Sequence, residues 1–425
     1  MSYQKITLKE GIYFHKIQTN KFKTNLFAIF LTVPITRENV TKNALTTTVL
    51  RRGTNKMPTQ EEISKKLEEM YGAAFDCGIE KIGDNQSLKF YLEVVNNQFL
   101  PEKEDLVEMS LELLMDIVFH PLIENKQFKE EYVQGEKENL KQIIESKLDN
   151  KATYALESCI ENMYEEKPYG LYKYGYVEDL QGITAKTLYE YYQGLIQSCQ
   201  IDIFASGDFG AEKLERIVEK SFKEYKERKP NLVLKWEEKE EIKEPKKKIE
   251  SKQISQGKLV IGLDVKTDKE EENYKTVVYN TVLGGGSNSK LFQNVREKES
   301  LAYTVSSSYA RRKQNIFIRA GIEIENYDKA LEIIKKQLQD MKEGNFSEED
   351  LNNAKNLLLS TIENIPEEQD TEITYYFGQE LAGTEDTIEM YQEKIKNVSK
   401  KDVVEVANKI QINTIYFLTN QGGQE

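Results

Sequence analysis

The chain repeats one order of elements twice, and this repeat limits its fold more than any other feature. In each half, a segment with alternating apolar residues is followed by two segments with apolar residues at helical spacing. Alternation predicts a strand, and apolar residues three or four apart predict a helix. The segments run strand, helix, helix in each half: 85–95, 100–118 and 121–146, then 314–324, 325–344 and 345–364.

We therefore predict two similar halves of the α+β class. Strands interspersed with pairs of amphipathic helices favour a mainly antiparallel sheet with helices packed on one face. Between the halves, RKPNLVLKWEEKEEIKEPKKK at 228–248 is rich in charge and broken by proline, as is typical of a connector. The predicted organisation is an N-terminal domain at 1–228, a linker at 229–248 and a C-terminal domain at 249–425.

Composition excludes several classes of function. The 425 residues carry a formal net charge of −13, which argues against nucleic acid as a partner because phosphate binding needs a basic face. The N-terminal segment MSYQKITLKEGIYFHKI has no apolar signal core, and no window of about 18 apolar residues occurs. We expect a soluble cytoplasmic protein without a membrane partner.

Residue types that carry catalysis are scarce. The sequence has two histidines, His15 and His120, and neither belongs to an HExxH or HxxEH motif. Neither lies beside a strained glycine turn that carries Ser or Cys, so no nucleophile and base are paired. The three cysteines form no CxxC pair. We therefore expect no metal and no cofactor, and an independent metal-free hydrolase is disfavoured.

The most distinctive stretch is VLGGGSNSKLFQNVREKESLAYTV, residues 282–305. The glycines Gly284, Gly285 and Gly286 end a predicted helix, but no Gly-Lys-Ser/Thr follows them, which disfavours a nucleotide loop. Arg296 lies near the end of the next helix, and Tyr303 lies at the start of a strand. Two interpretations stay open: both side chains are hydrogen-bond donors for a ligand, or Arg296 caps a helix and Tyr303 is half-buried in a strand.

This stretch resembles the C-terminal-half motif of the pitrilysin/insulinase family of zinc peptidases. The family includes the mitochondrial processing peptidase and short two-domain bacterial members. Supporting segments are LRRGT at 50–54, LEEMYGAAFDC at 67–77 and DIVFHPLIE at 116–124, and the resemblance covers essentially the whole chain. It implies two similar α+β halves that face each other across a cavity, with Gly284–Gly286 in a substrate loop.

The resemblance also implies where a zinc motif would lie. In active members, a helix before a Gly-Thr carries HxxEH, in which two imidazoles bind zinc and the Glu is the general base. Aligned on Gly53-Thr54, the corresponding positions are Ala44, Thr47 and Thr48. Alanine and threonine cannot replace imidazole, and threonine is no general base near neutral pH.

The third ligand of the family is a Glu on a later helix. The best alignment places Ile143 at that position, while Glu138 and Glu145 lie close enough to remain alternatives. With two or more of three ligands replaced, we predict a degenerate zinc site and no hydrolysis by the isolated chain.

Arg296 and Tyr303 match an Arg-Tyr pair that, in this family, reaches toward the scissile peptide from the C-terminal half. Guanidinium and phenol can stabilise a carbonyl oxygen that gains negative charge. The leading hypothesis is a catalytically inactive subunit that binds unfolded peptide and completes the site of a zinc-bearing paralogue in a heterodimer. A homodimer is the alternative assembly.

A second hypothesis comes from another class of function. The chain would be a binding or scaffold protein without a proteolytic role. Genomes with this Lys/Glu/Ile-rich composition encode paired members of the family, and one such lineage is linked by name to modification of elongation factor P. Loss of a pair's activity on changing Arg296 and Tyr303 would favour the first hypothesis.

Overall fold

The structure is a computed structural model that describes residues 2–101, 104–226, 228–234, 238–267 and 270–420. It divides into two compact units. Unit 1 consists of Met1–Glu145, Leu171–Val233 and Glu368–Gly378, and unit 2 consists of Ser146–Gly170, Leu234–Glu367 and Gln379–Glu425. Each unit therefore takes in one segment from the other half of the sequence.

Unit 1 is built on a six-stranded sheet in the order β1-β2-β8-β3-β5-β4. Its strands are β1 Ser2–Lys9, β2 Ile12–Gln18, β3 Thr24–Pro34, β4 Ala74–Ile82, β5 Asn85–Val95 and β8 Gln200–Gly207, with the short pair β6 Ile123–Glu124 and β7 Gln127–Phe128. Its helices are α1 Val40–Leu50, α2 Gln60–Glu69, α3 Leu106–Phe119, α4 Glu130–Glu145, α6 Val177–Leu180, α7 Ala185–Ser198 and α8 Ala211–Phe222.

Unit 2 is built on a five-stranded sheet in the order β11-β12-β10-β13-β9. Its strands are β9 Lys246–Ser251, β10 Gly257–Val265, β11 Ala302–Ala310, β12 Asn315–Ile322 and β13 Ile410–Thr419. Its helices are α5 Lys151–Met163, α9 Glu272–Gly284, η4 Phe292–Lys298, α10 Tyr327–Glu343, α11 Glu348–Glu363, α13 Ile388–Lys396 and α14 Lys400–Asn408. Helix α12, Gln369–Ala382, contributes its first ten residues to unit 1.

The two sheets share one pattern of pairing. In unit 1, β3 pairs antiparallel with β5 and β8, β5 pairs antiparallel with β4, and β8 pairs parallel with β2. In unit 2, β10 pairs antiparallel with β12 and β13, β12 pairs antiparallel with β11, and β13 pairs parallel with β9. The predicted α+β class with two similar halves is confirmed, and the predicted strand at 85–95 coincides with β5.

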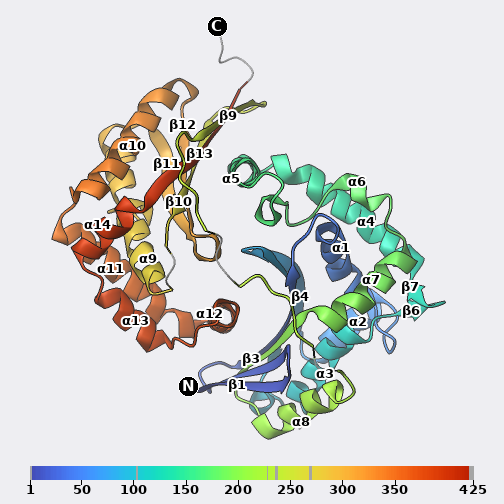
Figure 1. Cartoon of the computed structure of the whole chain (residues 1–425). Coiled ribbons are helices and arrows are strands. Elements are labelled where there is room, and N and C mark those ends of the chain that lie inside the picture. The colour runs from blue at the N-terminus through green and yellow to red at the C-terminus, as the bar shows by residue number, and fades with distance from the viewer. Residues whose placement is uncertain (1, 102–103, 227, 235–237, 268–269, 421–425) are drawn as a thin grey trace. The chain divides into compact units, whose positions relative to one another are not determined.

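Helices cover one face of each sheet, as Figure 1 shows for α9, α10, α11 and α14 in unit 2. In unit 1, a continuous apolar core lies between the sheet and helices α1, α3, α7 and α8. Strand β3 explains this arrangement: Phe27, Ile29 and Leu31 alternate toward that core and are fully buried. Their burial is the main stabilising term of the layer.

The opposite face of each sheet is covered by a helix from the other half of the sequence. In unit 1, the Phe377 ring of α12 stacks on Phe30 of β3 with ring centroids 3.9 Å apart. In unit 2, Cys159 and Met163 of α5 join a buried cluster with residues of β10, β12 and β13. In the part of the chain that the structure describes, no helix is long and apolar enough to span a bilayer.

The division into continuous domains at 1–228 and 249–425, joined by a linker at 229–248, stays a prediction. The connector changes from unit 1 to unit 2 between Val233 and Leu234, and residues 235–237 lie outside the described residues. The backbone of Val233 is held by Asn85, whose amide side chain donates to its carbonyl oxygen at 2.9 Å and accepts from its N–H at 3.0 Å. On the other side, Lys239 pairs with Asp264 at 3.1 Å.

Candidate functional site

Helix α1 places Ala44 and Thr47 in the interior of unit 1. Ala44 is 3% exposed and belongs to the apolar core, and Thr47 is 2% exposed. The Thr47 hydroxyl donates to the carbonyl oxygen of Asn43 at 2.9 Å, and the Thr48 hydroxyl donates to that of Leu45 at 3.1 Å. Such bonds to the preceding turn satisfy a threonine within a helix. Both hydroxyls are therefore used by the helix itself.

Helix α4 places no buried, unpaired carboxylate beside α1. Ile143 lies on α4 with 38% of its surface exposed and has no donor atom for a metal. Glu138 and Glu145, the alternatives for the third ligand, are exposed. The carboxylate of α4 that is buried is Glu136, and it accepts a hydrogen bond from Nε of Arg52.

The side chains at these positions determine whether zinc can bind. A hydrolytic zinc ion needs three side-chain ligands of the imidazole or carboxylate type. The four positions offer an alanine methyl, two engaged hydroxyls and an isoleucine, and the nearby Glu136 carboxylate is paired with Arg52. The residues present do not fit a zinc site.

Arg296 lies on η4, a π-helical segment. Its guanidinium lies 4.7 Å from the centroid of the Phe292 ring, and its Nε is 3.6 Å from a carboxylate oxygen of Glu297. The side chain is 44% exposed. π-Helical turns are rare and occur often at functional sites, so the backbone here presents an accessible cation on an irregular turn.

Tyr303 lies on β11, an edge strand of the unit 2 sheet. The register with β12 shifts between Ala302 and Thr304, so Tyr303 falls at a bulge, and it is 59% exposed. Its hydroxyl donates to Glu323, and this hydrogen bond to a carboxylate raises the pKa of Tyr303. Bulges re-aim side chains and are frequent beside active sites. The alternative of a half-buried strand tyrosine is not what the structure shows.

The glycine turn has a packing reason. A Cβ at Gly284 would lie 2.5 Å from the Ser307 hydroxyl oxygen and 2.7 Å from the Ser307 nitrogen. The end of α9 thus approaches β11 too closely for a side chain. Beside Gly285 and Gly286, a hollow of about 220 Å³ opens between the end of α9 and α11. The role of these glycines as a substrate loop stays a prediction.

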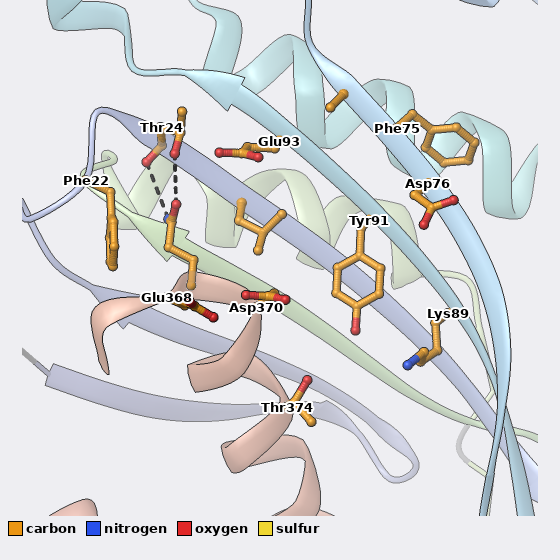
Figure 2. Close-up of a pocket in the computed structure, with 13 residues that line it drawn as sticks. Phe22, Thr24, Phe75, Asp76, Lys89, Tyr91, Glu93, Glu368, Asp370 and Thr374 are labelled. Atoms are coloured by element: carbon orange, nitrogen blue, oxygen red, sulfur yellow. Dashed lines mark hydrogen bonds between the residues drawn. The ribbon is translucent and has the colours of Figure 1, made fainter. Parts of the chain in front are cut away.

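Unit 1 contains a larger hollow that the sequence alone does not reveal. It has a volume of about 580 Å³ and lies between strands β3, β4 and β5 and the start of α12. Figure 2 shows Asp76, Tyr91 and Lys89 on the strands across from Asp370 and Thr374 of the helix. Four carboxylates and one ammonium line it, so the lining is acidic: Asp76, Glu93, Glu368, Asp370 and Lys89.

The hydrogen bonds of two residues, Lys89 and Gln369, shape this hollow. Lys89 donates to Glu80 of β4 at 2.5 Å, so its charge is already paired along the sheet. Gln369 fixes the start of α12 by accepting from the Thr24 hydroxyl at 2.9 Å and donating to the Ser206 carbonyl oxygen at 2.8 Å. The alternation Lys89, Tyr91, Glu93 is visible in the sequence, but the wall from α12 is not.

The buried histidine of unit 1 does not form a hydrolytic triad. His15 Nε2 lies 3.0 Å from Asp202 Oδ1, and its Nδ1 lies 2.9 Å from the Tyr3 hydroxyl. The imidazole is fully buried and stacks on Phe204 with centroids 4.1 Å apart. The hydrogen bonds of both ring nitrogens thus go to a phenol and a carboxylate rather than to a Ser or Cys.

The chain is similar to known proteins of one peptidase family. Residues 182–358 match the family described as the Peptidase M16 inactive domain. The chain is 35% identical over 418 residues to "Probable inactive metalloprotease YmfF" of Bacillus subtilis (strain 168), covering 97% of each chain. It is 24% identical over 260 residues to "Uncharacterized zinc protease YmxG" of the same strain, covering 60% of each chain.

A solved structure is similar over the full length. The crystal structure of a conserved protein from Enterococcus faecalis V583 covers 100% of both chains with a TM-score of 0.89 and 26% identity. The relationship to YmfF over nearly all of the chain establishes the family. The chain belongs to the M16 family of peptidases, the pitrilysin/insulinase type indicated by its motifs, and is an inactive peptidase-like member of it.

Proposed function

We propose that this chain is the zinc-less subunit of a heterodimeric peptidase, in which it binds extended peptide and lends Arg296 and Tyr303 to a zinc-bearing paralogue. The single observation that carries the proposal is a contrast in this chain. On α1, Ala44 and Thr47 are buried and Thr48 is half-buried, and none of them is a zinc ligand. By contrast, Arg296 and Tyr303 are 44% and 59% exposed on irregular backbone.

Exposure of the two donors fits a role outside the chain. Guanidinium and phenol stabilise negative charge on oxygen without a metal, provided that they can reach it. A helix-capping arginine or a packing tyrosine needs neither a π-helical turn nor a bulge, and both irregularities are frequent at functional sites. We infer that these irregularities are kept because they aim the donors toward a bound peptide.

Peptide binding is supported by the edge of the unit 1 sheet. Strand β4 pairs with β5 on one side and lies at the sheet edge on the other. An extended peptide can add to such an edge through backbone hydrogen bonds and place alternate side chains in pockets. Ala74, Phe75 and Asp76 of β4 line the acidic hollow, so side chains of an added strand would lie over it.

Two relatives from one bacterial strain support the proposal of a zinc-bearing partner. The chain resembles both a protein named as an inactive metalloprotease and a protein named as a zinc protease, and both come from one strain of Bacillus subtilis. A genome that holds both kinds of member can supply zinc on one chain and the Arg-Tyr pair on the other.

The test is reconstitution. The purified chain, a zinc-bearing M16 relative from the same genome, and their mixture are assayed on unstructured peptides with a fluorophore and a quencher. We expect no cleavage by this chain alone, and cleavage by the mixture that a chelator stops. Cleavage by this chain alone would contradict the proposal.

Variants then assign the roles. Arg296→Ala and Tyr303→Phe are each expected to lower kcat/KM of the mixture by about 100-fold, as removal of one oxyanion donor does. Arg319→Ala is the matched control, because Arg319 is another exposed arginine of unit 2. Unchanged cleavage by both site variants would instead favour a scaffold protein without a proteolytic role.

A further inference from the structure

The open end of the β11–β12 hairpin brings Tyr303 beside Glu323. Ala302 pairs with Ile322, and the bulge places Tyr303 just beyond that pair. Glu323 follows the last residue of β12 and is exposed. The Tyr303 hydroxyl donates to Oε1 of Glu323. The phenol proton therefore points along the hairpin toward a residue of the same chain.

A phenol has one proton to donate. While Glu323 accepts it, Tyr303 cannot donate to the oxygen of a peptide carbonyl. The elements packed against β11 are β12, α9 and η4. The charge that acts on the phenol is Glu323, whose hydrogen bond raises the pKa of Tyr303. On η4, the Arg296 guanidinium lies against Phe292 and near Glu297.

We propose that, in the resting state, Glu323 holds the Tyr303 hydroxyl in this hydrogen bond, an arrangement called the clasp below. A bound peptide must displace Glu323 before the phenol can act in the assembled peptidase. The proposal rests on the function proposed above. It names Glu323 as a regulatory residue that acts through Tyr303 and does not itself touch the substrate. A single hydrogen bond between exposed groups is weak enough to exchange, because water competes for both partners.

The contact is tested first in the isolated chain, where no partner is needed. In protein labelled with 13C at tyrosine Cζ, the Tyr303 resonance is assigned through Tyr303→Phe and followed against pH. We expect a pKa above that of an exposed tyrosine, near 10, which falls toward that value in Glu323→Ala. Glu325→Gln, which removes an exposed carboxylate two residues away, should leave it unchanged. A Tyr303 pKa that does not change in Glu323→Ala would overturn the clasp.

The consequence is tested in the reconstituted mixture. Releasing the phenol should raise kcat/KM by about two- to tenfold in Glu323→Ala, the range that one exchanged hydrogen bond can supply. In a Tyr303→Phe background, Glu323→Ala should have no further effect, because there is no phenol to release. A loss of activity in Glu323→Ala, similar to that of Tyr303→Phe, would show that Glu323 assists Tyr303 and would reject the clasp.

The two proposals fail separately. An inactive mixture of wild-type chains would reject the heterodimeric peptidase, whereas the titration of Tyr303 would still decide whether Glu323 holds it. An active mixture with an unperturbed Tyr303 titration would keep the peptidase and reject the clasp.

Discussion

Helix α1 of unit 1 and helix α9 of unit 2 occupy the same place in two matching sheets, and they end in similar sequences. Both contain Thr-Val-Leu, at 48–50 and at 281–283. In both, that threonine donates to a carbonyl of the preceding turn, at 3.1 Å in α1 and 2.9 Å in α9. Helix α1, where the family resemblance places the zinc motif, therefore has the same local chemistry as its counterpart in unit 2.

The edge strands differ more. Strands β4 and β11 each begin with an alanine and run for 9 residues. Their second residues are Phe75, which lines the acidic hollow, and Tyr303, which is exposed at a bulge. The β4–β5 hairpin therefore forms a pocket wall in unit 1, whereas the matching β11–β12 hairpin presents a hydrogen-bond donor in unit 2. The repeat therefore preserves the strand pairing, whereas the side chains on the two edge strands differ in chemistry.

Restoring the metal motif in α1 should give the largest effect. Ala44→His, Thr47→Glu and Thr48→His together would force an imidazole and a carboxylate into positions that are 3% and 2% exposed. Overpacking and an unpaired buried charge should cost at least about 4 kcal/mol. Thermal unfolding and zinc analysis check this, with Thr48→His alone as the milder control. A stable variant holding one zinc per chain would show that the two helices are not equivalent.

Weakening the packing of α12, the helix that covers the unit 1 sheet, should have the next largest effect. Phe377→Ala removes a ring that is 2% exposed and stacked on Phe30 at 3.9 Å. The expected loss is about 3–5 kcal/mol, as for other buried phenylalanines. Leu357→Ala on α11, where Leu357 is 45% exposed, should cost less than about 1 kcal/mol. Chemical denaturation measures both, and equal losses would mean that α12 does not stabilise the unit 1 sheet.

Gly284→Ala tests the turn at the end of α9, where the sequence differs from that at the end of α1. The added Cβ would lie 2.5 Å from the Ser307 hydroxyl oxygen, and we expect a loss of about 2 kcal/mol from the strain. Arg51 stands at the matching place in α1, so unit 1 has no such demand. Gly378→Ala is the control, because no atom lies within 4 Å of its added Cβ. That variant should be neutral or slightly stabilising, and a neutral Gly284→Ala would remove the packing reason.

The smallest effect concerns pH. Burial raises the pKa of Glu372 on α12 to about 7, above its ordinary value near 4.3. The folded state then binds this proton more tightly, so the contribution of Glu372 to the free energy of unfolding is largest below about pH 4 and is lost as pH rises through about 7. Glu372→Gln should flatten this part of the profile and stabilise the chain by about 1–2 kcal/mol at pH 8. Denaturation at pH 5 and pH 8 measures it, and a parallel shift at both would assign the gain to packing.

Periodicity carried the prediction of the fold. Alternation placed one strand at 85–95, where β5 lies, and the duplicated order of elements indicated two similar halves. Residue chemistry alone was enough to predict that Ala44, Thr47 and Thr48 cannot bind zinc, because no packing turns a methyl or a hydroxyl into an imidazole.

Other features depend on contacts that local pattern does not specify. An amphipathic helix must bury its apolar face, but its sequence does not say against which sheet, so the docking of Phe377 on Phe30 could not be foreseen. The hollow joins Asp76 to Asp370, far apart in the chain. The partner of Tyr303 lies 20 residues away across a bulge, and neither the bulge nor the π-helical turn has a sequence signature.

The exchange of covering helices has a consequence for synthesis on the ribosome. Unit 1 includes residues up to Val233, yet its last segment ends at Gly378, 145 residues later. At roughly 5–20 residues per second, translation leaves the face of the first sheet that carries Phe30 bare for roughly 7–30 seconds. During that interval the nascent chain is a natural client for chaperones, and its first half becomes complete only when the second half is nearly made.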